Sequence, residues 1–353
     1  MKTKLLYLVL FLLPIISIAQ EVHTVDNRIG TTALFNNVQD AIDAAAEGDY
    51  IYIHPSETNY GNISIRKTLH IRGLGHNPEL NGGEHAKLSN ISLDIDSVAG
   101  TSGSDSTISG IETATISVSA ANTISDLQIS NCYITIRLDL INSVNTLVNG
   151  NIIDNSEIRF GPIQSGNIIT NNIFNWTNVS SSVNLINGMN DTNIFSNNVV
   201  LIKDTSNIFR NSNLPVVKNC LFLFADDANS PTSVILENST VYFQNCLTFS
   251  YGGQTIDTLN GINNLDNVNP QLEDLGTPED PLFSYDKDYA ISVGSPAQNA
   301  GEDGTDLGIF GASFNFIMRG YPFDLPYPTS INIANPIIQA GATMQVELTA
   351  EGN

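Results

Sequence analysis

Basic residues are scarce in this sequence. The chain has 14 Lys and Arg against 36 Asp and Glu, which gives a net charge of -22 and a pI near 4.2. A surface of this sign repels the phosphates of nucleic acids and the head groups of anionic lipids, so neither class is an expected partner. Divalent cations remain compatible with this charge.

Cysteine is also scarce, and its count is odd. The three cysteines, Cys132, Cys220 and Cys246, cannot serve as a disulfide framework. We expect all three to be buried as small apolar side chains.

Long hydrophobic runs are missing after the N-terminus. The one early run, from Leu5 to Ile16, follows two lysines and precedes small residues that end at Ala19. It is too short to span a membrane comfortably and is typical of a secretory signal peptide over residues 1–19. The sequence therefore predicts cleavage near Ala19 and a product without a membrane span that is secreted or held at the cell surface.

The mature sequence begins with one amphipathic helix. Apolar side chains repeat at helical spacing from Val38 to Ala45, and Gly48 ends the pattern. A helix of the form AIDAA, then GD, a strand ending in proline and two strands closing on RG resemble the N-terminal cap of right-handed parallel β-helix proteins, the pectate lyase-like superfamily. Such a cap covers the apolar interior of the first coil. The β-rich segments after the helix lie at residues 50–53, 63–65 and 69–73.

A short unit then recurs in place of any helical pattern. Its copies read ISNCYI, LVNGNII, IITNNIF, IFSNNVV, VVKNCLF and YFQNCLT, and their anchor residues lie 19, 21, 26, 22 and 26 positions apart, which is about one β-helix coil each time. We expect the anchors to stack as an inward ladder at a turn. They are Cys132, Asn151, Asn172, Asn198, Cys220 and Cys246.

The resemblance implies an all-β, right-handed parallel β-helix with a short N-terminal capping α-helix and a small C-terminal β extension. The segment SPAQNAG after residue 294 and the D-x-G turn that follows resemble the closing coils of such proteins. The predicted organisation is signal peptide at 1–19, cap helix and first coils at 20–85, β-helix with closing coils at 86–319, and a Pro-rich extension with a β-hairpin at 320–353.

The columns around the anchors predict which side chains face inward. The residue before each anchor is Asn or Gly, the types that tolerate a left-handed backbone, and the residue three positions upstream is always apolar. Because successive side chains of a strand alternate between its two faces, four residues four positions after their anchors are expected to face inward: Ile136, Trp176, Ile202 and Phe224. The same alternation leaves an apolar stripe facing outward, unless a bulge rotates it inward. That stripe is Tyr133, Ile152, Ile173, Val199, Leu221 and Leu247, and it needs a cover or a partner. The C-terminal hairpin is expected to cover either this stripe or the open end of the coils.

Catalytic motifs are hard to find. A glycosidase needs two carboxylates, but Asp226 and Asp227 form the one adjacent Asp pair and lack the neighbouring motifs of the polygalacturonases. All five histidines precede residue 86, apart from the repeats. Basic and acidic residues five to seven positions after the anchors predict a mixed stripe for glycan binding, with Arg137 or Lys203 as the base of a lyase; solvated charges beside a turn are the competing interpretation. The candidates are Arg137, Asp139, Lys203, Asp204, Asp226, Asp227 and Tyr251.

One acidic loop suggests calcium. Glu302, Asp303 and Asp306 surround glycines and offer hard oxygen ligands, although Asp and Gly also make ordinary turns. No cofactor is required by the pattern, and calcium is the one the sequence offers.

Three functions follow from these expectations. The first is a non-catalytic exported β-helix that binds a polysaccharide or a cell-surface protein. The second is a divergent polysaccharide lyase for acidic glycans, dependent on calcium. The third is a structural assembly subunit that packs through its apolar stripe.

Overall fold

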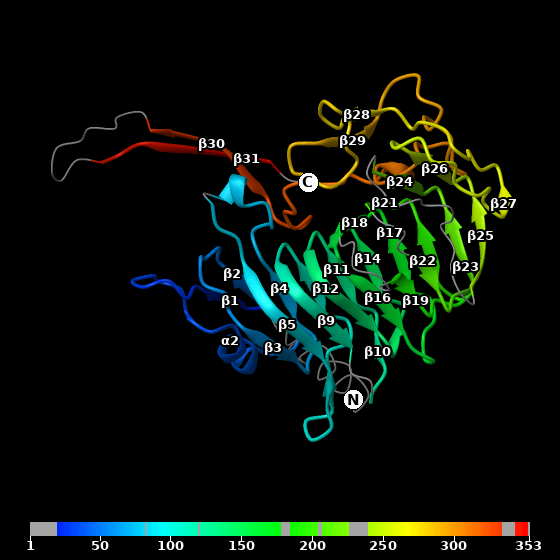
Figure 1. Ribbon diagram of the computed structural model, residues 1–353. Coiled ribbons are helices and arrows are strands. Elements are labelled where there is room, and N and C mark those ends of the chain that lie inside the picture. The colour runs from blue at the N-terminus through cyan, green and yellow to red at the C-terminus, as the bar shows by residue number, and fades with distance from the viewer. Residues whose placement is uncertain are drawn as a thin grey trace, which may run out of the picture.

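The structure is a computed structural model. It describes residues 20–81, 83–118, 121–177, 184–203, 207–225, 239–333 and 343–351. The predicted signal peptide lies outside these residues. Short parallel strands stack in successive coils from the N-terminal helix toward the other end of the molecule (Figure 1).

One side of the coils is an 11-stranded parallel sheet, here sheet A. Its strands follow one another in chain order with two or three residues each in the middle coils, because every coil contributes one strand and then turns. They are β1 (Val22–Val25), β2 (Tyr50–Ile53), β4 (His70–Arg72), β8 (Thr107–Ser109), β11 (Gln128–Ser130), β14 (Leu147–Asn149), β17 (Ile168–Thr170), β20 (Ile194–Ser196), β23 (Asn213–Lys218), β25 (Thr240–Gln244) and β27 (Gly261–Ile262).

The other sides form a 12-stranded sheet, sheet C, which divides at β12. The first half of β12 pairs with β15 and the second half with β16, so two rows of strands run on from it. One row is β15 (Ile152–Asp154), β18 (Ile173–Trp176), β21 (Val199–Ile202), β24 (Leu221–Phe224) and β26 (Leu247–Ser250). The other is β16 (Glu157–Phe160), β19 (Asn184–Asn187) and β22 (Asn207–Arg210), and toward the N-terminus β12 (Tyr133–Leu140) continues into β9 (Glu112–Val118), β5 (Lys87–Leu93) and β3 (Asn62–Ile65).

Small elements complete the fold. Helix α2 (Val38–Ala44) buries Val38, Ala41 and Ile42 against the first coil, and the Asn37 side chain caps it. The other pairs and turns are β6 (Ile95–Asp96) with β7 (Thr101–Ser102), β10 (Ile124–Ser125) with β13 (Ser143–Val144), β28 (Leu272–Asp274) with β29 (Asp288–Ile291), β30 (Tyr327–Ile333) with β31 (Val346–Glu351), and the 3₁₀ turns η1 (Pro78–Asn81) and η2 (Gly311–Ser313).

The interior is a stack of apolar side chains in register. The residues three positions before the anchors face inward from sheet A and are fully buried, as the sequence predicts, and Trp176 is buried with them. Aromatic rings of adjacent coils pack against one another; for example, the ring centroids of Phe174 and Phe195 are 5.4 Å apart. Strand order and register confirm the predicted right-handed parallel β-helix. The inward row on sheet A is Ile129, Val148, Ile169, Phe195, Val217 and Phe243.

A turn of fixed chemistry joins sheet A to sheet C in each coil. Asn131, Asn171 and Asn197 stand just before anchors with φ of 52°, 53° and 54°, the left-handed region that asparagine tolerates. The anchors beside them stack: Asn151 Nδ2 donates to Asn172 Oδ1 at 2.9 Å. Cys132, Cys220 and Cys246 are buried and free, in the same column of positions.

Replacement of Asn172 by alanine is expected to lower the free energy of unfolding by about 2 kcal/mol. Its amide donates to Val148 O at 3.0 Å and Asn198 Oδ1 at 3.0 Å, and it accepts from Asn151, so alanine leaves several buried groups without partners. Asn172→Cys is the matched control, because cysteine holds this position in three other coils, and it should cost less. Urea denaturation measures both; equal losses would show that the amide contacts do not matter.

The apolar stripe on the first row of sheet C is covered by the chain itself. Residues 270–324, here the C-terminal wrap, place a second hydrophobic core over it, and Ile152, Ile173, Val199 and Leu221 are fully buried. The prediction that the C-terminal hairpin covers the stripe is wrong, because β30 and β31 extend away from the coils with exposed side chains (Figure 1). The side chains of the wrap that face the stripe are Leu272, Leu275, Tyr289, Ala297, Leu307, Ile309 and Phe316.

Turn asparagines hold the wrap in place. Asn245 Nδ2 donates to Ala300 O at 2.8 Å, and Asn219 Oδ1 accepts from Glu302 N at 2.9 Å. Asn171 Nδ2 donates to Ile309 O at 2.9 Å. Further down the coils, Asn131 Nδ2 donates to Tyr321 O at 2.8 Å. The wrap therefore passes the coils in reverse order.

Candidate functional site

Charged side chains line up on the outer face of β12, β16, β19 and β22. Asp139 pairs in register with Arg159, Arg159 with Asn187, and Asn187 with Arg210. Arg137 pairs with Glu157 on the same face. We call these six residues, Arg137, Asp139, Glu157, Arg159, Asn187 and Arg210, the arginine column.

A bulge in β12 sets the orientation of the first two residues. The register with β9 shifts between Ile134 and Arg137, so the alternation restarts after the anchor half of the strand. Leu138 is buried in the core, whereas Ile136 is 59% exposed. The prediction that Ile136 faces inward is therefore wrong, because it assumed uninterrupted alternation.

Asp139 joins the two neighbouring arginines. It is buried, and its carboxylate accepts from Arg137 Nε at 2.7 Å and from Arg159 Nε at 2.6 Å and Nη2 at 3.0 Å. The hydrogen bond from Asp139 raises the pKa of Arg159, against the effect of burial. Arg159 therefore stays charged and cannot accept a proton. Asp139 leaves the remaining guanidinium N–H groups, including both Nη atoms of Arg137, for a ligand, since the two arginine side chains are 39% and 35% exposed.

The far end of the column is open. Glu157 accepts from Asn187 Nδ2 at 3.0 Å and lies 4.0 Å from Arg159. Within the described part of the chain, Arg210 has no acidic partner. Among the six residues of the column, three guanidinium groups thus stand against two carboxylates, on a protein with a net charge of -22.

Two of the other predicted glycan-binding residues are described, and they lie apart from the arginine column. Lys203 and Tyr251 follow β21 and β26 in matching positions of the first row, but Arg137 lies in the second row, because its partner is Glu157. Tyr251 packs edge-on against Phe249 at 4.9 Å, and burial raises its pKa. Asp204, Asp226 and Asp227 lie outside the described residues.

The predicted calcium ligands point to separate partners. Glu302 accepts from Lys218 Nζ at 2.9 Å, Asp303 from Thr305 Oγ1 at 2.7 Å, and Asp306 from Asn299 N at 2.8 Å. The three carboxylates do not converge. Calcium binding here stays a prediction from the sequence.

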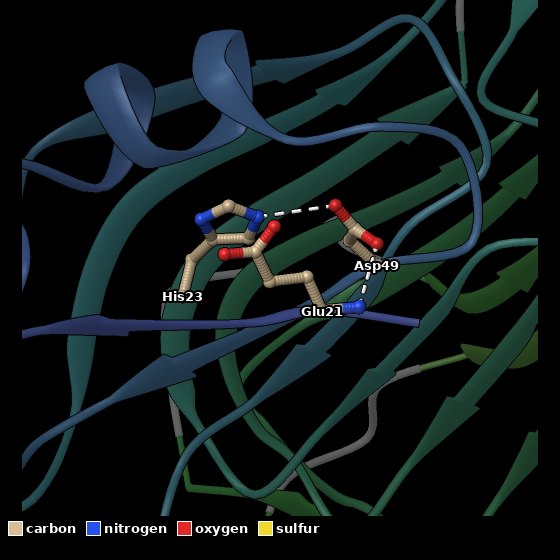
Figure 2. A group of neighbouring side chains, drawn as sticks. All are labelled: Glu21, His23 and Asp49. Atoms are coloured by element: carbon tan, nitrogen blue, oxygen red, sulfur yellow. Dashed lines mark hydrogen bonds and ion pairs between the residues drawn. The ribbon is translucent and has the colours of Figure 1, made fainter. Parts of the chain in front are cut away.

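One group of possible metal ligands does converge in the described ranges, at the N-terminal cap. Glu21, His23 and Asp49 have ligand atoms within 4.8 Å of one another (Figure 2). Asp49 is already used: it accepts from Glu21 N at 2.9 Å, Ala46 N at 2.8 Å and His23 Nε2 at 3.1 Å. Burial opposes its ionisation, but these hydrogen bonds outweigh burial and lower its pKa. The group braces the start of β1 against the end of α2.

Two histidines reach the repeats despite their early positions. His76 Nδ1 lies 2.8 Å from the Tyr285 hydroxyl, and the centroids of the His76 and Tyr133 rings are 5.8 Å apart. His85 pairs with Glu112 of β9. These two histidines contact residues of the coils, so the inference that all five histidines lie apart from the repeats is wrong. His76 is fully buried beneath the wrap, and its Nε2 has no hydrogen-bond partner; burial, with a smaller effect of His85, lowers its pKa to about 3. It fixes the wrap and is closed to substrates.

The sequence missed Arg159 and Arg210. A signal for them exists in a second repeat, after the anchor repeat of each coil. RLDL and EIRF alternate polar and apolar side chains at 137–140 and 157–160, and LIN and IFR at 185–187 and 208–210 each end on a polar residue after an apolar one. Aligning these segments would have placed Arg159 beside Asp139 and Arg210 two coils further on.

Comparisons with known proteins concern the fold. The sequence matches no model of a protein family and no curated protein. Among solved structures, the chain is similar to pectate lyase Pel9A, with a TM-score of 0.46 and 13% identity over 83% of this chain and 97% of that one. A pectin methylesterase in complex with a hexasaccharide follows, with a TM-score of 0.24 and 12% identity over 68% of this chain and 92% of that one. By its strand order and register, the chain is a parallel β-helix protein.

Proposed function

We propose that this protein is an exported, non-catalytic β-helix module that binds a carboxylate-bearing polysaccharide along the arginine column. The observation that carries the proposal is the presence of Arg137, Arg159 and Arg210 on one face, from β12, β16 and β22. They are three of only 14 basic residues in the chain. Export rests on the predicted signal peptide.

The chemistry of the column suits carboxylates. Guanidinium groups bind carboxylates through two parallel N–H donors, and Asp139 orients two of them while leaving donors free. Neighbouring strands lie about 4.8 Å apart, so β12, β16 and β22 present cationic groups along the helix axis, with Asn187 of β19 between the last two. A linear polymer with repeated carboxylates can meet several of them together.

Binding without catalysis is supported by the state of these side chains. Elimination from a uronate needs a base that can accept a proton. The raised pKa of Arg159 removes that residue, and both Arg137 and Arg159 already hold Asp139. The lyase alternative is tested in the same experiment as binding.

Arg137→Ala and Arg210→Ala are each expected to weaken binding of polygalacturonate about tenfold, which is about 1.4 kcal/mol. Calorimetric titration of the full chain, with and without calcium, measures affinity, and ultraviolet absorbance measures unsaturated product. Arg28→Ala is the matched control, because Arg28 forms a similar pair with Asp26 at 2.7 Å far from the column. It should leave the affinity unchanged.

Two outcomes contradict the proposal. Equal affinities of the parent and both column variants would remove the column as the site. Unsaturated product formed by the parent protein would replace the binding module with the lyase. High salt should weaken binding in the parent, since the contacts are ionic and partly exposed.

A further inference from the structure

The outer face of sheet A carries two columns of side chains that run along the coils in register. One column is polar: Ser130, Asn149, Thr170, Ser196, Lys218 and Gln244. The neighbouring column is apolar: Leu147, Ile168, Ile194, Val216 and Tyr242. This face is separate from the arginine column, which belongs to sheet C.

The apolar column is open to solvent. Ile168 is 36%, Val216 42% and Tyr242 43% exposed. No described segment covers them, in contrast to the stripe on sheet C. Exposed apolar side chains in a row, bordered by polar ones, mark a surface that binds something.

The C-terminal wrap turns part of this face into a groove. A hollow of about 340 Å³ lies between Ile168 and Ile194 on the sheet and Ala312 and Phe314 on the wrap. Lys218 reaches across to Glu302 at 2.9 Å, and Asp303 lies beside them. From the hollow, the apolar column continues in register to the exposed Val216 and Tyr242, so hollow and column together, here the groove, suit an extended chain.

A peptide is a poor occupant of this groove. Peptides that bind sheets as added strands use the free N–H and C=O groups of an edge. The groove lies on a face, where β17, β20 and β23 pair with strands on both sides. A bound peptide backbone would find side chains alone for its hydrogen bonds.

An anionic polymer is also disfavoured. Lys218 is the one basic residue in the groove lining, and Glu302 neutralises it. Asp303 adds negative charge at the same wall. The interaction with Lys218 lowers the pKa of Glu302, which keeps its carboxylate charged.

We infer that this groove binds an uncharged polysaccharide chain laid along the helix axis. Sugar hydroxyls can donate to the oxygens of Thr170 and Ser196, whose own protons are used: Ser196 Oγ donates to Thr170 Oγ1 at 3.1 Å and Thr170 Oγ1 to Asn171 Oδ1 at 2.6 Å. The C–H faces of sugar rings pack on Ile168, Val216 and Tyr242 and remove that apolar surface from water. The inference goes beyond the arginine column and stands independently of it.

The test titrates the full chain with soluble β-glucan, mannan and xylan. At least one polymer should bind. Tyr242→Ala removes the aromatic ring that packs on the sugar, and Thr170→Val removes a hydroxyl while keeping the shape of the side chain, so each should weaken binding about tenfold. Ile331→Ala is the matched control, an exposed apolar residue of β30. Arg210→Ala, which affects the acidic glycan, should leave this affinity unchanged.

Three results would overturn the inference. The first is that none of the three neutral polymers binds, whatever polygalacturonate does. The second is that binding is identical in the parent, Tyr242→Ala and Thr170→Val. The third is a dimer seen by light scattering that Tyr242→Ala dissociates, which would make this face a contact between copies of the chain.

Discussion

Acidification from pH 6.5 to pH 3 is expected to lower the free energy of unfolding by about 4 kcal/mol through His76 alone. In the folded chain its ring is buried beside Tyr285 with Nε2 unpartnered, and its pKa falls to about 3; in the unfolded chain it returns to 6.5. Well above pH 6.5, His76 is neutral in both the folded and the unfolded chain, so it does not lower the free energy of unfolding. As the pH falls below 6.5, the unfolded chain binds a proton that the folded chain refuses.

Urea denaturation between pH 7 and pH 3.5 measures this effect. Other groups also lose stability in acid, for example Asp49, whose pKa is lowered, so the test is the difference between the parent and His76→Gln. The parent should lose about 1.4 kcal/mol per pH unit more than the variant. Tyr285→Phe removes a hydrogen bond and keeps the burial, so it should retain the steep slope. Parallel curves for parent and His76→Gln would rule out His76 as the cause.

Leu221→Ala is expected to lower the free energy of unfolding by about 3 kcal/mol, within the range for a buried leucine. Leu221 is fully buried under the wrap, and Gly308 packs so closely that a Cβ there would lie 3.0 Å from Leu221 Cδ1 and Val199 Cγ2. The wrap backbone is held by the turns, so it cannot collapse into the cavity. Thermal and urea unfolding of the full chain measure the loss.

Val216→Ala provides the contrast on the uncovered sheet. Val216 lies on β23, the strand just before that of Leu221, but its side chain is 42% exposed. Its replacement by alanine should therefore lower the free energy of unfolding by well under 1 kcal/mol. A loss as large as that of Leu221→Ala would mean that sheet A is also covered in solution. A small loss at Leu221 would mean that the wrap does not pack on the stripe.

The fold could be predicted because the coil repeats its own chemistry. An apolar residue, a turn asparagine and an inward anchor recur at each coil, and local backbone preference and burial favour the same arrangement. That repeat was sufficient to place Ile169, Phe195 and Trp176 in the core, where they lie.

The sites could not be predicted in the same way, because non-local features create them. The bulge in β12 turns Ile136 outward and divides the sheet, so residues at equal distance from their anchors, such as Arg137 and Lys203, enter different rows. The cover of the stripe comes from about 100 residues later in the chain. Nothing in the stripe itself, a run of single apolar residues one per coil, states whether it faces solvent or the wrap.

The reverse path of the wrap bears on how this protein can change during evolution. Solenoids commonly gain or lose whole repeats, since each repeat contacts its neighbours alone. Here four of the turns, at Asn245, Asn219, Asn171 and Asn131, bond points of one later segment that follow in the opposite order. Adding or deleting a coil would put those points out of step with the turns. The wrap therefore fixes the number of coils, and we expect length variation only in the loops between strands.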